Sequence, residues 1–387
     1  MLRNYFKIAW RSLSRNKVYS AINVLGLSLG ISACLVIFLI THYELDFDKF
    51  HPQRERIYRV VADNQSPEGE HRSVGFTTDP MAMTVRSEIT GLQAVTGFYS
   101  YPTNVSIPNN GKVDLKFDRP KFGTPSPIVI TDPQYFEIFQ YQWLAGNPAT
   151  SISRPFQVVL TESEAQKYFG PGTPDQFVGR QVWYSDSLHT VVSGIIKDWT
   201  ENTDLNFRDF ISFATVQHSF LQQNIDLTAW GMWNWETQAF VKLADGVTKT
   251  QVERQLAGLA KRHLVGPKGN KDILSLQPLS DIHFNAKYED AFSRKASLPA
   301  LYTLMGIAAF ILLIAAVNFI NLSTAQSIQR VREVGIRKVL GSRRSGLIIQ
   351  FLTETFVLTF VAVVLSIVLV NPILHAFQSF VPAGVAF

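Results

Sequence analysis

Three side chains that could bind a metal ion stand close together at Asp46, Asp48 and His51 of the 387-residue chain. Carboxylate and imidazole groups are common zinc ligands, and a zinc site takes three or four of them from the protein. The sequence offers no further ligand in a suitable place to complete a site around them. The three residues also directly follow a long apolar stretch. We therefore expect them to form the start of a stalk and not a metal site.

Two further sets of residues could carry chemistry. Trp230, Trp233 and Trp235 could stack a sugar or an apolar substrate, but tryptophans in a β-rich stretch usually serve packing, which is our expectation here. His283 stands next to Phe284 with no nucleophile or acid beside it in the sequence, so we expect it to be structural.

The sequence lacks the motifs of common hydrolases. It contains no G-x-S-x-G or H-E-x-x-H pattern and no Cys/His metal spacing. Residues 266–271 come nearest to a P-loop, but they lack the required Gly-Lys-Ser/Thr order. We therefore expect a non-catalytic chain without a cofactor, unable to hydrolyse nucleotide by itself.

The elements around these residues are dominated by three stretches without charge, at positions 18–40, 296–329 and 355–387. A helix needs ~20 apolar residues to cross a bilayer, and each stretch exceeds that length. The chain averages of 46% hydrophobic and 17% charged residues hide this segregation. We predict a bundle of three transmembrane helices at 18–41, 298–322 and 346–371, the first being a retained anchor.

Basic residues flank these spans and predict their orientation. Residues 1–17 hold five cations and no acid, and the 323–345 loop is also strongly basic. Lys and Arg near membrane ends mark the cytoplasmic side. The N-terminus and the 323–345 loop are therefore predicted inside, with residues 42–297 and 372–387 outside. Acids outnumber bases in the 42–297 segment, so the basic net charge gives no support to nucleic-acid binding.

Residues 1–17 are predicted to form an amphipathic helix on the inner membrane surface. Arg3, Lys7, Arg11 and Arg15 recur at every fourth position, and Trp10 lies on the opposite, apolar side. Such a helix places its cations on lipid phosphates. Membrane lipids are thus expected partners.

The 42–297 segment is predicted to be a mixed α+β domain of two subdomains. The only cysteine, Cys34, lies in the first span, so no disulfide staples this domain. Two predicted capping boxes start helices at Thr161–Glu164 and Thr250–Glu253. Runs rich in β-branched residues predict strands at 56–62, 95–99, 127–131, 156–160, 189–196 and 237–243.

Gly26 and Gly30 stand four residues apart in the first span. Small residues at this spacing allow two helix backbones to approach closely. We predict that they mark a helix-packing face.

The loop between the second and third spans is predicted to contain a short helix with two faces. Glu333 can pair with Arg337 at i,i+4, while Val334, Ile336 and Val339 contribute to an apolar side. The alternative is a plain basic loop, which would not require an apolar face. The helix is suited to dock in the groove of a cytoplasmic partner.

This loop resembles the R-E-x-G-[IV]-[RM]-[KR]-x-[LI]-G motif of MacB/FtsX-type ABC transporter permeases. Further similar stretches are residues 7–13 and 23–30, 132–136, 159–162 and 276–284. The resemblance implies that the loop carries the helix that engages an ATPase. The residues it assigns to ATPase coupling are Arg332, Glu333, Val334, Gly335, Ile336, Arg337, Lys338, Val339, Leu340 and Gly341.

The resemblance further implies a permease subunit of an exporter or mechanotransmission complex in the bacterial inner membrane, with its large domain in the periplasm. ATP and magnesium would bind to a separate ATPase subunit. A second permease copy or half, and a periplasmic adaptor or outer-membrane component, are further implied partners. The alternative is an FtsX-like regulator of a periplasmic partner such as a cell-wall hydrolase. The family has four spans per unit, whereas this chain stops soon after its third. We therefore expect either a part of a longer or tandem permease or a truncated product.

Overall fold

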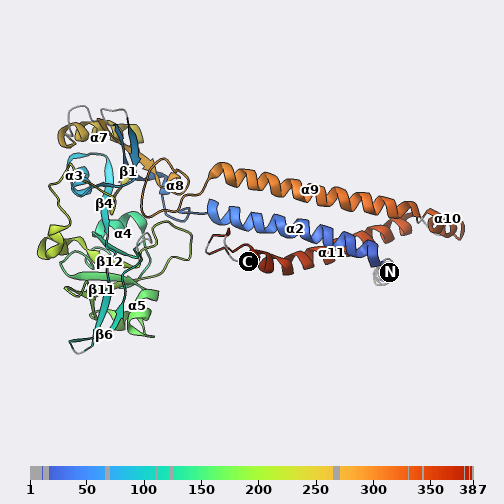
Figure 1. Cartoon of the computed structure of the whole chain (residues 1–387), viewed down its shortest axis with the longest axis horizontal. Coiled ribbons are helices and arrows are strands. Elements are labelled where there is room, and N and C mark those ends of the chain that lie inside the picture. Colours follow the sequence, from blue (N-terminus) through green and yellow to red (C-terminus); the bar gives the residue numbers. More distant parts are fainter. Residues whose placement is uncertain are drawn as a thin grey trace. The chain divides into compact units, whose positions relative to one another are not determined.

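The computed structural model describes residues 11, 17–65, 70–109, 111–121, 126–264, 271–329, 331–341, 344–378, 380–382 and 384–385. The chain forms two compact units (Figure 1): Met1–Leu45 with Leu298–Phe387, and Asp46–Ser297. The amphipathic helix expected at residues 1–17 lies outside the described residues apart from Arg11 and Lys17.

The first unit consists of long apolar helices. Helices α2 (Lys17–Leu45), α9 (Leu298–Gln329) and α11 (Arg344–Ala376) are each long and apolar enough to cross a membrane. At 1.5 Å per residue each exceeds the ~30 Å hydrocarbon core. They also extend beyond the predicted spans, because a helix continues through the interfacial region until its backbone groups find other partners. The predicted membrane bundle is confirmed in its helical elements.

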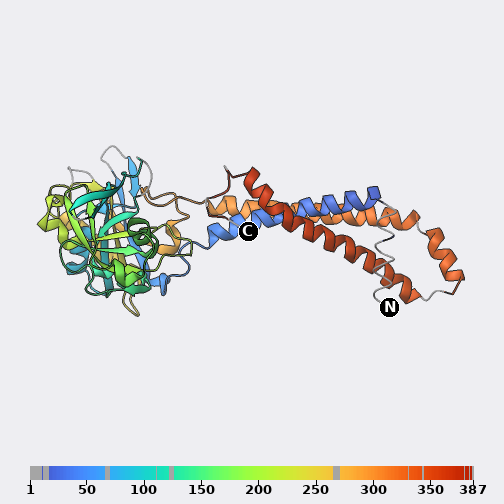
Figure 2. The same cartoon turned by 90° about the horizontal axis from the view of Figure 1, so that it is seen from below.

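Helix α2 packs against both other long helices. Figures 1 and 2 both show α2 and α9 side by side along most of their length, with α11 crossing them. A buried side-chain hydroxyl links α2 to α11, since Ser32 Oγ donates to the carbonyl oxygen of Ser366 over 3.2 Å. Tyr19 OH donates to Ser323 Oγ of α9 over 3.0 Å. Such interhelical hydrogen bonds help helix association where no hydrophobic driving force exists.

The second unit is built on a 13-stranded mixed sheet in the described part of the chain, with the order β15-β1-β14-β4-β7-β12-β9-β11-β10-β5-β6, β2 on β1 and β8 on β11. A small two-stranded sheet joins β13 and β3. The strands of both sheets are β1 (Ile57–Gln65), β2 (His71–Val74), β3 (Thr77–Thr78), β4 (Leu92–Ser100), β5 (Val105–Asn109), β6 (Lys112–Phe117), β7 (Ile128–Thr131), β8 (Trp143–Ala145), β9 (Gln157–Thr161), β10 (Gln181–Tyr184), β11 (Leu188–Ile196), β12 (Asp209–Ser212), β13 (Trp233–Asn234), β14 (Thr237–Leu243) and β15 (Lys271–Pro278).

Short helices accompany this sheet. They are η1 (Arg54–Arg56), α3 (Met81–Glu88), α4 (Pro133–Phe139), α5 (Glu162–Phe169), α6 (Pro174–Phe177), η2 (Phe213–His218), η3 (Phe220–Gln223), α7 (Lys249–His263) and α8 (Leu279–Ile282). Within this unit, Figure 1 shows α7 beside β1 at one end and α5 beside β6 at the other. The unit is thus a mixed α+β domain, as predicted.

The apolar core of this unit is divided into three clusters. One surrounds α7 and β1 and includes Val60 and Leu256. A second lies at the other end of the sheet around β9 and β11 and includes Ile195. The third is rich in aromatic rings around α4, and includes Phe98.

All six predicted strands are present, with ends shifted by up to three residues except for Thr237–Leu243, which matches β14. Thr161 caps α5 as predicted, accepting a hydrogen bond from the Glu164 amide over 3.4 Å. The capping box predicted at Thr250 is wrong, because α7 begins two residues earlier and its N-cap is Thr248, paired with Gln251. Thr248 satisfies the box pattern equally well, since Gln251 follows it at the third position.

Candidate functional site: the short helix between α9 and α11

The residues assigned to ATPase coupling lie on α10 (Val331–Val339) and the turn that follows it. The Leu340 amide donates to the Ile336 carbonyl oxygen over 3.0 Å and the Gly341 amide to that of Lys338 over 3.1 Å. Gly341 has φ +87°, the left-handed conformation that ends helices and favours glycine. The motif thus specifies both the helix and its stop.

Helix α10 exposes most of its apolar side chains. The exposed fractions are 65% for Val331, 58% for Ile336, 89% for Val339 and 79% for Leu340. Three of these side chains lie on α10, and Leu340 follows the helix directly. Grouped exposed apolar residues mark interaction surfaces. We call these four residues the α10 apolar surface.

The remaining motif residues are placed less completely. Val334 is half-buried, and Gly335 and Lys338 are exposed. A methyl group added at Gly335 would meet no atom within 4 Å. The side chains of Arg332, Glu333 and Arg337 lie outside the described residues, and so does the predicted Glu333–Arg337 pair.

Gly26 and Gly30 face α9. A Cβ atom added to Gly30 would come within 2.6 Å of Ala315 Cβ, whereas one added to Gly26 would lie 3.6 Å from Asn318 Nδ2. The two helices therefore approach each other more closely at Gly30 than at Gly26. This contact joins the helix that leads into α10 to the helix that precedes Asp46 in the chain.

Asp46, Asp48 and His51 do not converge on one point. Asp48 is buried and accepts a hydrogen bond from Thr203 Oγ1 over 2.5 Å, and its Oδ1 lies 3.5 Å from His51 Nε2. Asp46 instead pairs with Lys49 at 3.8 Å and is half exposed. Within the described ranges no three potential metal ligands gather. Asp48 holds the start of the second unit against the segment around Thr203.

Trp230, Trp233 and His283 take packing positions. The packing role expected of Trp235 is wrong, because this residue is 53% exposed. Trp230 stacks on His263 with ring centroids 4.4 Å apart, and Trp230 and Trp233 pack on the cluster around α7. His283 stacks on Phe47 at 3.7 Å, and its Nδ1 lies 3.1 Å from Asp204 Oδ2. Burial raises the pKa of Asp204 although His283 opposes the shift. These contacts are what structural roles require.

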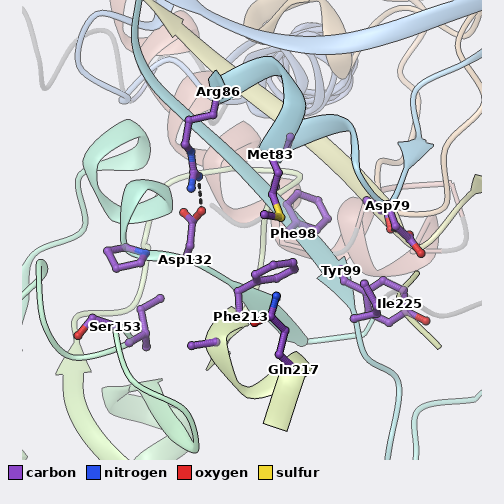
Figure 3. A pocket seen from close by; sticks show the side chains of 16 residues that line it. Asp79, Met83, Arg86, Phe98, Tyr99, Asp132, Ser153, Phe213, Gln217 and Ile225 are labelled. Atoms are coloured by element: carbon purple, nitrogen blue, oxygen red, sulfur yellow. Dashed lines mark hydrogen bonds and ion pairs between the residues drawn. The ribbon is translucent and has the colours of Figure 1, made fainter. Parts of the chain in front are cut away.

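Sequence reasoning missed a cavity of about 320 Å³ in the second unit. Figure 3 shows Arg86 and Asp132 together on one side of it and Asp79 with Tyr99 on the other. Asp132 could have been found, because an acid before Pro133 is a typical helix N-cap. Nothing in the local sequence places Asp79, Phe98 and Phe213 around one space.

Comparison with known families identifies the class of the chain. Residues 20–259 match the model of the MacB-like periplasmic core domain, and residues 305–387 match that of the FtsX-like permease C-terminal region. The first match covers more than half of the chain. The chain therefore belongs to the family that carries the MacB-like periplasmic core domain, which confirms the resemblance seen in the sequence.

Curated relatives agree. The chain is 22% identical to the macrolide export ATP-binding/permease protein MacB 1 of Yersinia pestis bv. Antiqua, over 98% of this chain and 54% of the relative. It is 21% identical to the MacB protein of the same description from Salmonella typhimurium, with the same coverage. The chain thus spans about half the length of these relatives.

Two solved structures are also similar. A permease domain from Porphyromonas gingivalis matches with a TM-score of 0.49 and 18% identity, over 66% of this chain and 99% of that one. The periplasmic region of MacB from Actinobacillus actinomycetemcomitans matches with a TM-score of 0.38 and 18% identity, over 58% of this chain and 89% of that one.

Family and helices together define the kind of protein. The chain is a permease-type protein of the inner membrane, and the Asp46–Ser297 unit, which holds most of the matched core domain, is periplasmic.

Proposed function

We propose that the chain is the permease subunit of an ABC-type export or mechanotransmission complex, coupled through α10 to an ATP-binding partner that holds ATP and magnesium. The observation that carries this proposal is the α10 apolar surface, with Val339 and Leu340 almost fully exposed. A docked partner would cover these side chains, and burial contributes roughly 25 cal/mol per Å² of apolar surface.

The path of the movement follows from the helix packing. A push on α10 moves α9, which directly follows the second unit in the chain, and α9 packs on α2 at Gly30. Because α2 and α9 are each continuous helices, they transmit displacement with little bending. In this proposal three spans cross the membrane and the periplasmic unit expels or releases a substrate. A second permease copy or half, and a periplasmic adaptor or outer-membrane component, complete the complex.

A second candidate is a regulatory protein that activates a periplasmic partner such as a cell-wall hydrolase. The match of residues 305–387 to the FtsX-like permease C-terminal model fits this role as well as it fits export. Export predicts ATPase activity stimulated by a substrate. Regulation predicts instead that a hydrolase binds the Asp46–Ser297 unit.

Two substitutions at Gly335 test the coupling role. Gly335→Pro removes a helical hydrogen bond and costs ~3 kcal/mol within a helix, whereas Gly335→Ala fits the open space around that residue and favours the helix. Each variant would be purified in detergent from its native membrane, and co-purifying proteins identified by mass spectrometry. We expect an ABC-type ATPase with the wild type and Gly335→Ala, and a strongly reduced yield with Gly335→Pro.

Membrane insertion of all variants serves as the control, since neither substitution touches a long helix. Equal recovery of the ATPase with Gly335→Pro would exclude α10 as the coupling element. Absence of any ATPase from the wild-type preparation would contradict the permease role.

A further inference from the structure

The cavity in the periplasmic unit lies where the three apolar clusters meet. Ile152 and Phe98 belong to the aromatic cluster around α4, Tyr99 and Phe213 to the cluster around β9 and β11, and Ala82 to the cluster around α7. Its volume of about 320 Å³ lies within the range of small-molecule pockets, which begins near ~300 Å³. The wall is therefore mainly apolar and is supplied by separate elements of the fold.

Gly97 brings two of these elements together. A Cβ atom at this position would lie 2.8 Å from Ala82 Cβ, so α3 sits directly on β4. Helix α3 carries Met83 and Arg86 into the wall, while β4 supplies Phe98 and Tyr99. The shape of the pocket is thus built into the backbone packing.

The charges on one side of the pocket are already neutralised. Arg86 forms an ion pair with Asp132 and donates from Nε to the Val95 carbonyl oxygen over 3.2 Å. Asp132 Oδ1 also accepts from the Gln134 amide over 3.1 Å as the N-cap of α4, and from Thr96 Oγ1 over 3.0 Å. This carboxylate has its complement of partners, so the Arg86 side offers a ligand no unbalanced charge.

Asp79, on the other side, has only neutral donors. Its Oδ1 accepts from Asn234 Nδ2 over 2.8 Å and from Thr237 Oγ1 over 3.0 Å, and its Oδ2 accepts from the Asp226 amide over 3.0 Å. In the described ranges no Lys, Arg or His forms an ion pair with it. Burial, with the charge of Asp226, raises the pKa of Asp79 despite these hydrogen bonds. A cation beside Oδ2 would relieve that cost.

Tyr99 strengthens the preference for a cation. Figure 3 shows its ring beside Asp79. Burial and the charges of Glu236 and Asp79 raise the pKa of Tyr99 to about 12, so its phenol stays neutral. The faces of such rings attract ammonium groups.

We propose that this pocket binds small organic cations, with an apolar body against Met83, Phe98 and Phe213 and an ammonium group on the Asp79 carboxylate. The site is separate from α10 and does not depend on ATPase coupling. Its ligand class follows from an apolar wall with a single unbalanced negative charge.

Occupancy can be read from a thiol in the wall. The full chain with Cys34→Ser and Met83→Cys would be placed in lipid nanodiscs, and the rate of maleimide modification measured. Three probes with one apolar body and different charges would be added: phenylbutylamine, phenylbutanol and phenylbutyrate. We expect saturable protection, with the amine binding about tenfold more tightly than the alcohol and the acid binding least.

Ile273→Cys in the same Cys34→Ser background is the matched control. Ile273 is 58% exposed on β15 and does not line the pocket. No probe should protect this thiol, because it lies outside the pocket. Any effect of amine partitioning into lipid would act on both variants equally. Equal protection at both positions would therefore overturn the proposal.

Two further variants test the charge. Asp79→Asn should remove the preference for the amine. An unchanged rate of maleimide modification at the Met83→Cys thiol without probe would show that the pocket is intact. If Asp79→Asn disturbs the fold, Gln217→Lys places a cation at an exposed position on the pocket wall and should shift preference from amine to acid. Gln217→Met is its neutral control. Tighter binding of the acid to the wild type, or no discrimination among the probes, would refute recognition by Asp79.

Discussion

Arg59 and Asp290 form an ion pair at 2.7 Å in which the exposed fractions of the side chains are 1% and 0%. Arg59 lies on β1, the first strand after α2, and Asp290 lies in the segment that returns to α9. Gln277 Oε1 accepts from Arg59 Nη2 over 2.6 Å, and Lys295 Nζ also contacts Asp290 at 2.8 Å. The pair therefore joins the entry and exit segments of the periplasmic unit.

Removing this pair should destabilise the periplasmic unit strongly. Burial alone would raise the pKa of Asp290, but Arg59 and Lys295 hold it well below its usual value. Arg59→Met leaves a buried carboxylate without its main partner, which costs about 3–5 kcal/mol. Denaturant unfolding of the full chain followed by tryptophan fluorescence measures this, because every tryptophan except Trp10 lies in this unit.

Arg72→Met is the matched control for that measurement. Arg72 pairs with Glu289 at 2.8 Å, but the side chains are 60% and 58% exposed. Its loss should cost less than about 1 kcal/mol. Similar losses for the two variants would show that the buried pair does not hold the two segments together.

Asp209 should make the stability of the same unit depend on pH. Burial, followed by the charge of Glu164, raises its pKa from 3.8 to about 7. The folded chain then binds a proton more tightly than the unfolded chain. Stability is therefore greatest below the unfolded pKa and falls as pH rises through the folded one, by roughly 1.4 kcal/mol per pH unit.

Asp209→Asn should flatten this fall between about pH 4 and 7. The amide oxygen can still accept from Tyr168 OH and Tyr184 OH, which lie 3.0 and 2.6 Å from Asp209 Oδ2. Unfolding midpoints of both proteins measured across this range provide the comparison. An unchanged slope in Asp209→Asn would mean that another group causes the pH dependence.

The close approach of Gly30 to Ala315 predicts a compensating pair of substitutions in the membrane unit. Gly30→Ala places its methyl group 2.6 Å from Ala315 Cβ, so one helix must shift, and overpacking of this kind costs about 1–3 kcal/mol. Ala315→Gly in the same chain should restore much of the loss. The loss of the helical signal on unfolding in mixed micelles would be measured for the wild type, the two single variants and the double variant, which form a double-mutant cycle.

Gly306→Ala provides the control, because a methyl group there meets no atom within 4 Å. It should be neutral or slightly stabilising, as Ala favours helices. Additive effects of Gly30→Ala and Ala315→Gly would contradict the direct contact.

The start of α7 offers a test of which threonine caps it. The Thr248 amide donates to Gln251 Oε1 over 2.8 Å, whereas Thr250 lies exposed within the first turn. Thr248→Ala should cost about 1 kcal/mol, and Thr250→Ala about zero. The denaturant midpoints of the two variants decide between the two caps. A larger loss of stability in Thr250→Ala than in Thr248→Ala would show that Thr250 caps the helix.

The sequence alone predicted the membrane helices and the helix that became α10, and the orientation that it gives the spans stays a prediction. These features depend on composition along a continuous stretch: the bilayer sets a helix length, and flanking cations set its direction. The exposed apolar residues of α10 could be seen for the same reason, since Ile336 and Val339 are neighbours on one short helix. The β14 strand was likewise clear from its own residues.

Only the tertiary structure decided which distant residues meet. Strand β4 lies between β14 and β7, which come from far apart in the chain, and this order was not readable from any one strand. The partner of Gly30, the burial of the Arg59–Asp290 pair and the position of Asp79 beside Tyr99 have the same origin. Each of these features depends on which segments lie against one another after folding. The energy of a buried charge or of a close approach is set by burial and long-range contact and not by local conformational preference.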